Sequence, residues 1–313
     1  MAQVSSAPER RVDVSPFPDG AIAGRAAGAG SFRGLRQFLT RLLKVRGAAL
    51  GLIVLLLLIF LAVAAPIVSP ASPVETVLLE TLQAPSRAHP FGTDDLGRDV
   101  MARVIYGSRV SLEVGLISIT VALSFGVVVG LLAGYQGGIV DDILMRVMDA
   151  ISAFPSLILA LAITAALGAG IRNTMIAIGI VYTPLFARLV RSQALTIREL
   201  DYCLAARTLG AGAGRMMFFH IFPNATAPII VQASLSVSSA IIVEASLSFL
   251  GVGVAPPTPS WGSILNDGYK VLQLAPWMAI ASGSAIFISV LGLNFLGDGL
   301  RTALDPRMSR RGD

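Results

Sequence analysis

Long apolar runs separated by short polar stretches dominate the pattern along this chain. The first run covers 48–68, and further runs follow at 111–134, 147–169, 173–190, 225–250 and 277–297. Because a helix rises 1.5 Å per residue, about 20 residues cross the hydrocarbon core of a membrane. The pattern therefore predicts six membrane-spanning helices. Pro184 lies inside the fourth run, where we expect a kink and an early exit from the membrane.

The apolar runs divide the chain into five parts. Residues 1–47 are polar and basic; their first half is predicted to be disordered, and 31–46 to be either an amphipathic surface helix or a solvated lead-in. The first helix, 48–68, is followed by a long loop, 69–110. A five-helix core, 111–300, contains a polar loop at 191–222, and 301–313 form a basic tail.

Composition supports a membrane protein and excludes several other classes. Hydrophobic residues make up 54% of the 313 residues and charged residues only 14%, whereas soluble domains carry about 25% charged residues. One cysteine and two histidines exclude a disulfide scaffold, a Cys/His zinc site and an iron–sulfur centre held by this chain alone.

The distribution of basic residues predicts the orientation. With the N-terminus inside, 18 of the 24 Lys and Arg residues fall in inside segments and six in outside segments. The positive-inside rule then places both termini in the cytoplasm. The same rule explains the net charge of +5 without a nucleic-acid partner.

The polar loop at 191–222 is the most informative segment. Residues 197–209 lack Gly and Pro and predict a helix with a charged start that includes Asp201. Three glycines beginning at Gly210 then predict a sharp turn. Residues 215–222 predict a second short helix, which contains His220 and is ended by Pro223.

The loop resembles the EAA loop of ABC-importer permeases. The triplet Leu204-Ala205-Ala206, the glycine at 210 and the proline at 223 have the spacing of that loop. The resemblance implies a coupling helix that docks on an ATPase subunit, with coupling residues Asp201, Leu204, Ala205, Ala206, Arg207, Gly210, His220 and Pro223. Leu204 replaces the usual glutamate, so a salt bridge from that position is not expected.

Other stretches, in family order over about 220 residues, resemble dipeptide, oligopeptide and nickel permeases of the "C" type. They are His89-Pro90-Phe91-Gly92-Thr93-Asp94, Ala133-Gly134-Tyr135-Gln136-Gly137-Gly138, Ala153-Phe154-Pro155-Ser156, Glu244-Ala245-Ser246-Leu247-Ser248-Phe249-Leu250-Gly251 and Leu296-Gly297-Asp298-Gly299-Leu300-Arg301. The resemblance implies an all-α polytopic membrane protein with the type I ABC importer permease fold, in the bacterial inner membrane.

The same resemblance implies the partners and the cargo. They are a homologous permease in a heterodimer, two cytoplasmic ATPase subunits, an extracytoplasmic solute-binding protein and membrane lipid. The expected cargo is a short peptide; nickel complexes and glutathione are the other candidates. ATP and Mg²⁺ would bind to the ATPase subunits. This chain has no Gly-Lys-Ser/Thr and only the lysines Lys44 and Lys270, so it is expected to lack a Walker A site, any cofactor of its own and enzymatic activity.

Two alternative functions remain open at this point, and so does the role of one further set of residues. A stand-alone secondary transporter or channel would leave the 191–222 helix pair without a role, and a membrane-embedded enzyme would lack a catalytic constellation. On the fifth apolar run, Ser234, Ser238 and Glu244 are candidates for the translocation path. Small hydroxyl groups serve helix packing equally well.

Overall fold

The computed structural model describes residues 40, 42–43 and 45–304, and within them every regular element is a helix. The expectations for 1–39 and 305–313 lie outside the described residues. In chain order the elements are α2 (Arg46–Val68), η1 (Leu78–Glu80), α3 (Val100–Gln136), α4 (Gly138–Ser152), α5 (Ser156–Leu167), α6 (Ile171–Ile197), α7 (Asp201–Thr208), α8 (Ala213–Arg215), η2 (Met216–Ile221), α9 (Phe222–Phe249), α10 (Trp261–Lys270) and α11 (Pro276–Leu304).

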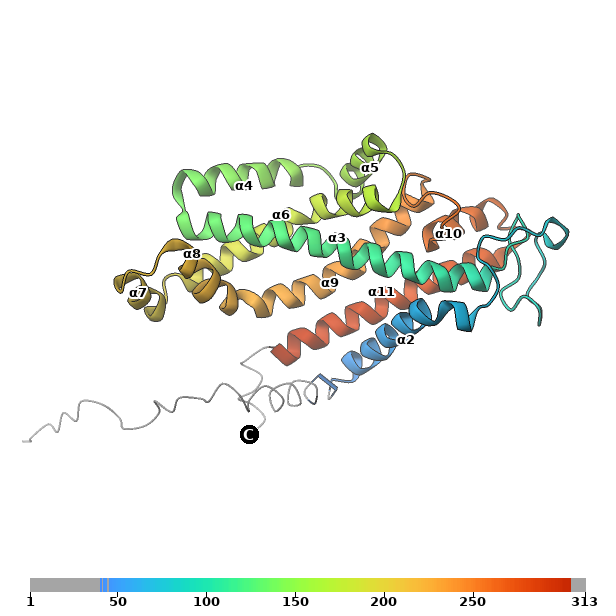
Figure 1. Cartoon of the computed structure of the whole chain (residues 1–313), viewed down its shortest axis with the longest axis horizontal. Helices are drawn as coiled ribbons and strands as arrows, with labels where there is room; N and C mark the ends of the chain where they lie inside the picture. The colour runs from blue at the N-terminus through green and yellow to red at the C-terminus, as the bar shows by residue number, and fades with distance from the viewer. Residues whose placement is uncertain (1–39, 41, 44, 305–313) are drawn as a thin grey trace, which may run out of the picture.

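The long helices run side by side along the long axis of the molecule (Figure 1). The most extensive helix pair is α3 with α6, and α11 packs against both α2 and α9. Helices α7 and α8 lie at one end of this bundle, whereas α10 and the segment between α2 and α3 lie at the other (Figure 1). The N-terminal end of α2 and the C-terminal end of α11 point towards the α7 end of the bundle (Figure 1).

Five described helices are long and apolar enough to cross a membrane, and a sixth span is present only if α4 and α5 are counted together. The predicted third span at 147–169 is not one continuous helix, because α4 and α5 meet at an angle of 88°. The break falls at 153–155. Pro155 has no backbone N–H and disfavours a helical conformation at the residue before it, so the helix cannot continue.

Helices α6 and α11 continue well past the C-terminal ends of their apolar runs. Helix α6 continues through Pro184 and past residue 190, to Ile197. Its basic residues keep partners in the bundle, since Arg191 binds both carboxylate oxygens of Asp141 at 2.5 Å and Arg198 donates to the Gly134 carbonyl at 2.8 Å. Helix α11 likewise reaches Leu304, into the predicted tail.

The predicted loop 69–110 ends eleven residues early, because α3 begins at Val100. Asp99 caps this helix by accepting a hydrogen bond from the Ala102 backbone N–H at 2.7 Å. The first turns of α3 carry charged residues, and the sequence pattern therefore assigned them to the loop. One of those charges, Arg103, is buried and ion-paired with Asp94 and Asp267.

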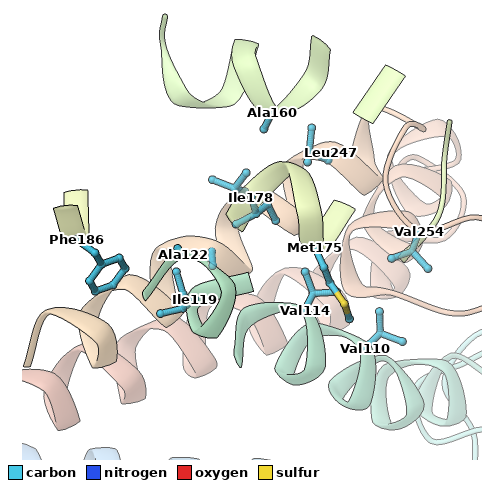
Figure 2. Close-up of a cluster of buried hydrophobic side chains, with 12 residues drawn as sticks. Val110, Val114, Ile119, Ala122, Ala160, Met175, Ile178, Phe186, Leu247 and Val254 are labelled. Carbon is cyan, nitrogen blue, oxygen red and sulfur yellow. The ribbon is translucent and has the colours of Figure 1, made fainter. Parts of the chain in front are cut away.

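The main core lies where α3, α5, α6 and α9 meet. Figure 2 shows apolar side chains from these helices converging on one another, with Val110, Val114, Met175, Ile178 and Leu247 among them. Between this cluster and the α7 end, α3 and α6 approach closely along a stripe of glycines at 126, 130 and 134. A Cβ added at Gly130 would lie 2.5 Å from the Ala187 carbonyl oxygen, so this contact requires glycine.

Residues 213–249 form one continuous helical run, in which η2 is a π-helix joined directly to α9. The prediction that Pro223 ends a short helix is therefore wrong. A π-helical turn shifts the hydrogen-bond register, and Pro223 then stands in the first turn of α9, where its missing N–H costs nothing.

Candidate functional site

Helix α7 sits on the end of the bundle and is held there by one buried side chain. Cys203 is 1% exposed and belongs to a cluster with Val190 of α6 and Met216 and Ile221 of η2. The predicted helix at 197–209 is thus split: α6 ends at Ile197, and α7 begins at Asp201. The short turn between them lets α7 lie as a separate element on the end of the bundle (Figure 1).

Gly210 ends α7 in a Schellman motif. Its φ of +84° lies in the left-handed region, and its N–H donates to the Arg207 carbonyl at 3.0 Å. The Ala211 N–H donates to the Ala206 carbonyl, also at 3.0 Å. These are the two bonds that define the motif, and the predicted glycine turn is confirmed. A Cβ at Gly210 would meet nothing within 4 Å, so only the backbone conformation demands glycine there.

The Schellman motif also fixes the orientations of Ala205 and Ala206. Ala206 and Ala211 both pack on the Cys203 cluster, as the apolar contact of a Schellman motif does. Ala205 is instead exposed. The expectation that both alanines lie on a docking surface is therefore corrected: Ala206 packs against this chain's own core, and Ala205 faces away from it.

Six of the eight residues of α7 are exposed, and four of them are spaced as one helix face: Asp201, Leu204, Ala205 and Thr208. We call this the outer face of α7. Leu204 is 44% exposed, and the neighbouring Leu209 is 88% exposed. Apolar side chains held in the open on a capped, anchored helix are typical of a surface that a partner protein covers.

The remaining predicted coupling residues lie beside the outer face rather than on it. Arg207 lines a polar pocket of about 200 Å³ between α7 and the end of α3, together with Glu199. His220 is half-buried in η2, where its carbonyl accepts a hydrogen bond from the Asn224 side chain at 2.7 Å. Pro223 is exposed on the first turn of α9.

The two serines named as candidates for the translocation path lie between α9 and α11. Ser238 is buried and donates to the Asn294 side-chain oxygen at 2.8 Å. The Ser234 hydroxyl donates to the Val231 carbonyl at 2.7 Å and lies where α11 comes closest, opposite Gly297. Both hydroxyl groups therefore serve helix packing in this structure.

Glu244 likewise lies inside the helix bundle, with none of its surface exposed. Its two carboxylate oxygens accept hydrogen bonds from Ser111 of α3 at 3.1 Å and from Ser248 of α9 at 2.8 Å. A buried carboxylate needs such donors, because an unpaired one carries a large desolvation cost. In this conformation Glu244 joins α3 to α9 and lines no open surface.

The open surface of α9 lies on a different face, which borders two grooves. An inner groove of about 460 Å³ lies between α6, α9 and α11, nearer the α7 end, and is lined by Val231, Gln232 and Leu235 of α9. An outer groove of about 430 Å³ reaches α5 and α10 and is lined by Ile242 and Ser246 of α9. Their lining residues on α9 recur every three or four positions, which places both grooves on one face of the helix.

Sequence reasoning missed the polar residues of this face. Gln232 is a polar side chain inside an apolar run, which is the pattern that marks functional positions in a membrane helix. Its signal was hidden by the serines on the same helix, one of which, Ser236, accepts a hydrogen bond from the Gln232 amide at 3.3 Å. Arg301, which also lines the inner groove, was assigned to the tail because it follows the last apolar run.

A buried charge network fixes the opposite end of the bundle. The Asp94 carboxylate has no exposed surface, accepts a hydrogen bond from Arg98 at 2.6 Å and also pairs with Arg103. Asp267 of α10 lies 3.3 Å from the Arg103 guanidinium. The network ties the segment before α3 to α10, and both lie at the end of the bundle opposite α7 (Figure 1).

Comparisons with known proteins agree with this arrangement. Residues 126–310 match the family model "Binding-protein-dependent transport system inner membrane component", and residues 35–85 match "N-terminal TM domain of oligopeptide transport permease C". The chain is 46% identical to the dipeptide transport system permease protein DppC of Alkalihalophilus pseudofirmus, over 87% of this chain and 90% of that one. It is 45% identical to the di/tripeptide permease DppC of Pseudomonas aeruginosa (88% and 92%) and 42% identical to the glutathione permease GsiD of Pectobacterium atrosepticum (87% and 91%).

Solved structures show the same fold. A MetNI methionine ABC transporter in an inward-facing conformation matches with a TM-score of 0.54 at 17% identity, covering 66% of this chain and 98% of that one. An amino acid ABC transporter matches with a TM-score of 0.51 at 17% identity, covering 64% and 94%. The expected ABC importer permease fold is confirmed.

Proposed function

Because the chain belongs to the family of binding-protein-dependent transport system inner membrane components, we propose that it imports short peptides as one of two paired permease subunits of an ABC importer. The peptide-transport names of relatives that are 45–46% identical support this cargo. The observation that carries the coupling role is the outer face of α7, an exposed and partly apolar surface on a helix that its own cap and Cys203 hold rigidly.

In this proposal the outer face of α7 docks on a cytoplasmic ATPase subunit, and the α7 end of the bundle is the cytoplasmic end. The basic residues Arg207 and Arg215 lie at that end, as the positive-inside rule requires. ATP and Mg²⁺ bind to the two ATPase subunits, since this chain contains no Walker A sequence. A solute-binding protein delivers the peptide to the opposite end, outside the membrane.

The helix contacts supply a route for coupling. Cys203 of α7 packs on Met216 of η2, and η2 continues without a break into α9. The open face of α9 then borders both grooves. A shift of α7 imposed by ATP-driven closure of the ATPase pair therefore moves the helix that carries the proposed path.

Exposed apolar side chains identify the lipid-facing part of the chain in this proposal. On α2 they include Ile53, Phe60, Val63 and Ile67, which are 58–84% exposed. Such a surface is stable in a bilayer of the bacterial inner membrane and unstable in water. A stand-alone carrier or channel would leave the outer face of α7 uncovered, so that alternative is not favoured.

The test is peptide uptake by the reconstituted importer, with the partner permease, both ATPase subunits and the solute-binding protein present. Ala205→Glu places a charge on the outer face of α7 without touching this chain's core. We expect uptake to fall about tenfold or more, because overpacking a docked surface costs about 1–3 kcal/mol and 1.4 kcal/mol is tenfold. The permease pair should still assemble.

Ala213→Glu is the matched control, since it introduces the same charge at an exposed alanine outside the outer face of α7. Its effect should be milder. Ala206→Glu is less informative, because it disrupts the Schellman contact within this chain. Normal uptake and normal stimulation of ATPase activity in Ala205→Glu would show that the outer face of α7 does not dock on an ATPase.

A further inference from the structure

The inner groove combines an apolar wall with two polar side chains. Leu189 of α6 and Val231 of α9 contribute apolar surface, whereas Gln232 of α9 and Arg301 of α11 contribute an amide and a guanidinium. Its volume of about 460 Å³ lies in the range of pockets that hold small organic ligands, about 300–1,000 Å³.

The groove extends into the membrane-spanning part of α9. Gln232 lies ten residues after the start of α9 at Phe222, which is about 15 Å along the helix. Arg301 is at a similar level, because Gly297, one turn before it, packs against Leu235. Polar and charged side chains at such depth avoid lipid and instead line a water-filled path or bind a ligand.

Both polar groups have free hydrogen-bonding capacity in the described part of the chain. Gln232 donates weakly to the Ser236 hydroxyl at 3.3 Å, and its amide oxygen accepts no hydrogen bond there. Among the same residues Arg301 forms no ion pair. A guanidinium pairs best with a planar carboxylate, which it binds through two parallel hydrogen bonds, and an amide oxygen accepts an N–H.

We propose that the inner groove binds the C-terminal end of the transported peptide. Arg301 holds the peptide carboxylate, and the Gln232 amide oxygen accepts the N–H of the last peptide bond. The apolar wall accommodates the last side chain. This assignment rests on the proposed function as a peptide importer. A phospholipid headgroup would also satisfy Arg301, and the second test below distinguishes it from a peptide end.

The first test compares a dipeptide with its C-terminal amide in proteoliposomes that contain the complete importer. Arg301→Gln should reduce uptake of the free acid about tenfold and leave uptake of the amide nearly unchanged, since a charge-assisted hydrogen bond is lost only with the acid. Arg301→Lys keeps the charge and should retain most of the preference. Equal losses for both peptides in Arg301→Gln, or no loss, would overturn the assignment.

Wild-type uptake in the same assay reports separately on the proposed function. If the wild-type importer moves no peptide, the proposed cargo is wrong and the groove assignment falls with it. If the wild type imports peptides and Arg301→Gln does not change the preference, only the groove assignment falls.

The second test labels the groove directly. Gln232→Cys, in a chain with Cys203→Ser, should react with a charged thiol reagent added from the α7 side, and saturating dipeptide should slow the reaction. Ser238→Cys, which is packed against α11, should not react. An unreactive Gln232→Cys, or one protected by added anionic lipid and not by dipeptide, would overturn the assignment.

Discussion

The close contact between α3 and α6 at Gly130 allows a prediction with a magnitude. Gly130→Ala places a Cβ 2.5 Å from the Ala187 carbonyl oxygen and 2.7 Å from the Val190 Cβ. Ordinary contacts of this kind are 3.4–4 Å, so the two helices must separate locally by about 1 Å. The neighbouring close contacts at Gly126 and Gly134 lie on the same stripe and are loosened by the same movement.

Overpacking by one methyl group costs about 1–3 kcal/mol. For this seam we expect about 2 kcal/mol, which lowers the ratio of folded to unfolded protein by about 30-fold. The measurement is unfolding of the purified chain in detergent, followed by circular dichroism against denaturant. Gly130→Val, with a larger side chain, should be more destabilising than Gly130→Ala.

Gly283→Ala is the matched control, because it adds the same methyl group within α11 at a position with nothing within 4 Å. It should be neutral, or stabilising by about 0.5–1 kcal/mol, since alanine favours a helix more than glycine does. If Gly130→Ala unfolds at the same denaturant concentration as the wild type, the α3–α6 seam is not close-packed and the argument is refuted.

Three other predictions follow from contacts described above. Cysteines at Ser86 and Thr258 should react with an impermeant reagent outside intact cells and one at Gly214 should not; the reverse pattern would invert the proposed orientation. Glu244→Ala should lower the denaturation midpoint more than Glu244→Gln, which keeps an acceptor for the serine donors; equal midpoints would argue against a packing role. Asp94→Ala should destabilise the chain by about 3 kcal/mol, because it removes the nearer carboxylate from the buried Arg103 guanidinium and leaves it only Asp267 at 3.3 Å; an unchanged midpoint would contradict this.

The apolar runs located the membrane helices, because about 20 consecutive apolar residues have few other stable uses. The ends of the helices were harder to predict. Helix α3 begins at Val100, before its apolar run, since the charge of Arg103 is neutralised by residues distant in sequence. The break at Pro155 was hidden by the apolar residues on both sides of it, which continue the hydrophobic pattern through the bend.

The candidate site was predictable in position but not in orientation. The glycine spacing located the turn after α7, and Gly210 has the positive φ that such a turn requires. Which alanine faces outward depends on the tertiary contacts of Ala206 with the Cys203 cluster. The role of the serines of α9 stayed open in the sequence for the same reason: a hydroxyl group serves packing or a path according to which neighbours it faces, and Ser238 faces Asn294.

The unbroken helix from η2 into α9 has a thermodynamic consequence. The 37 residues 213–249 extend about 55 Å, from the contact with α7 to Phe249, whose ring lies 5.9 Å from that of Tyr269 on α10. Because the helical run is continuous, a displacement at one end can be transmitted to the other, and binding at the two ends can be coupled. Free-energy coupling between two binding sites is reciprocal. If an ATPase binds at α7 as proposed, the factor by which it changes ligand binding at the α10 end equals the factor by which that ligand changes ATPase binding.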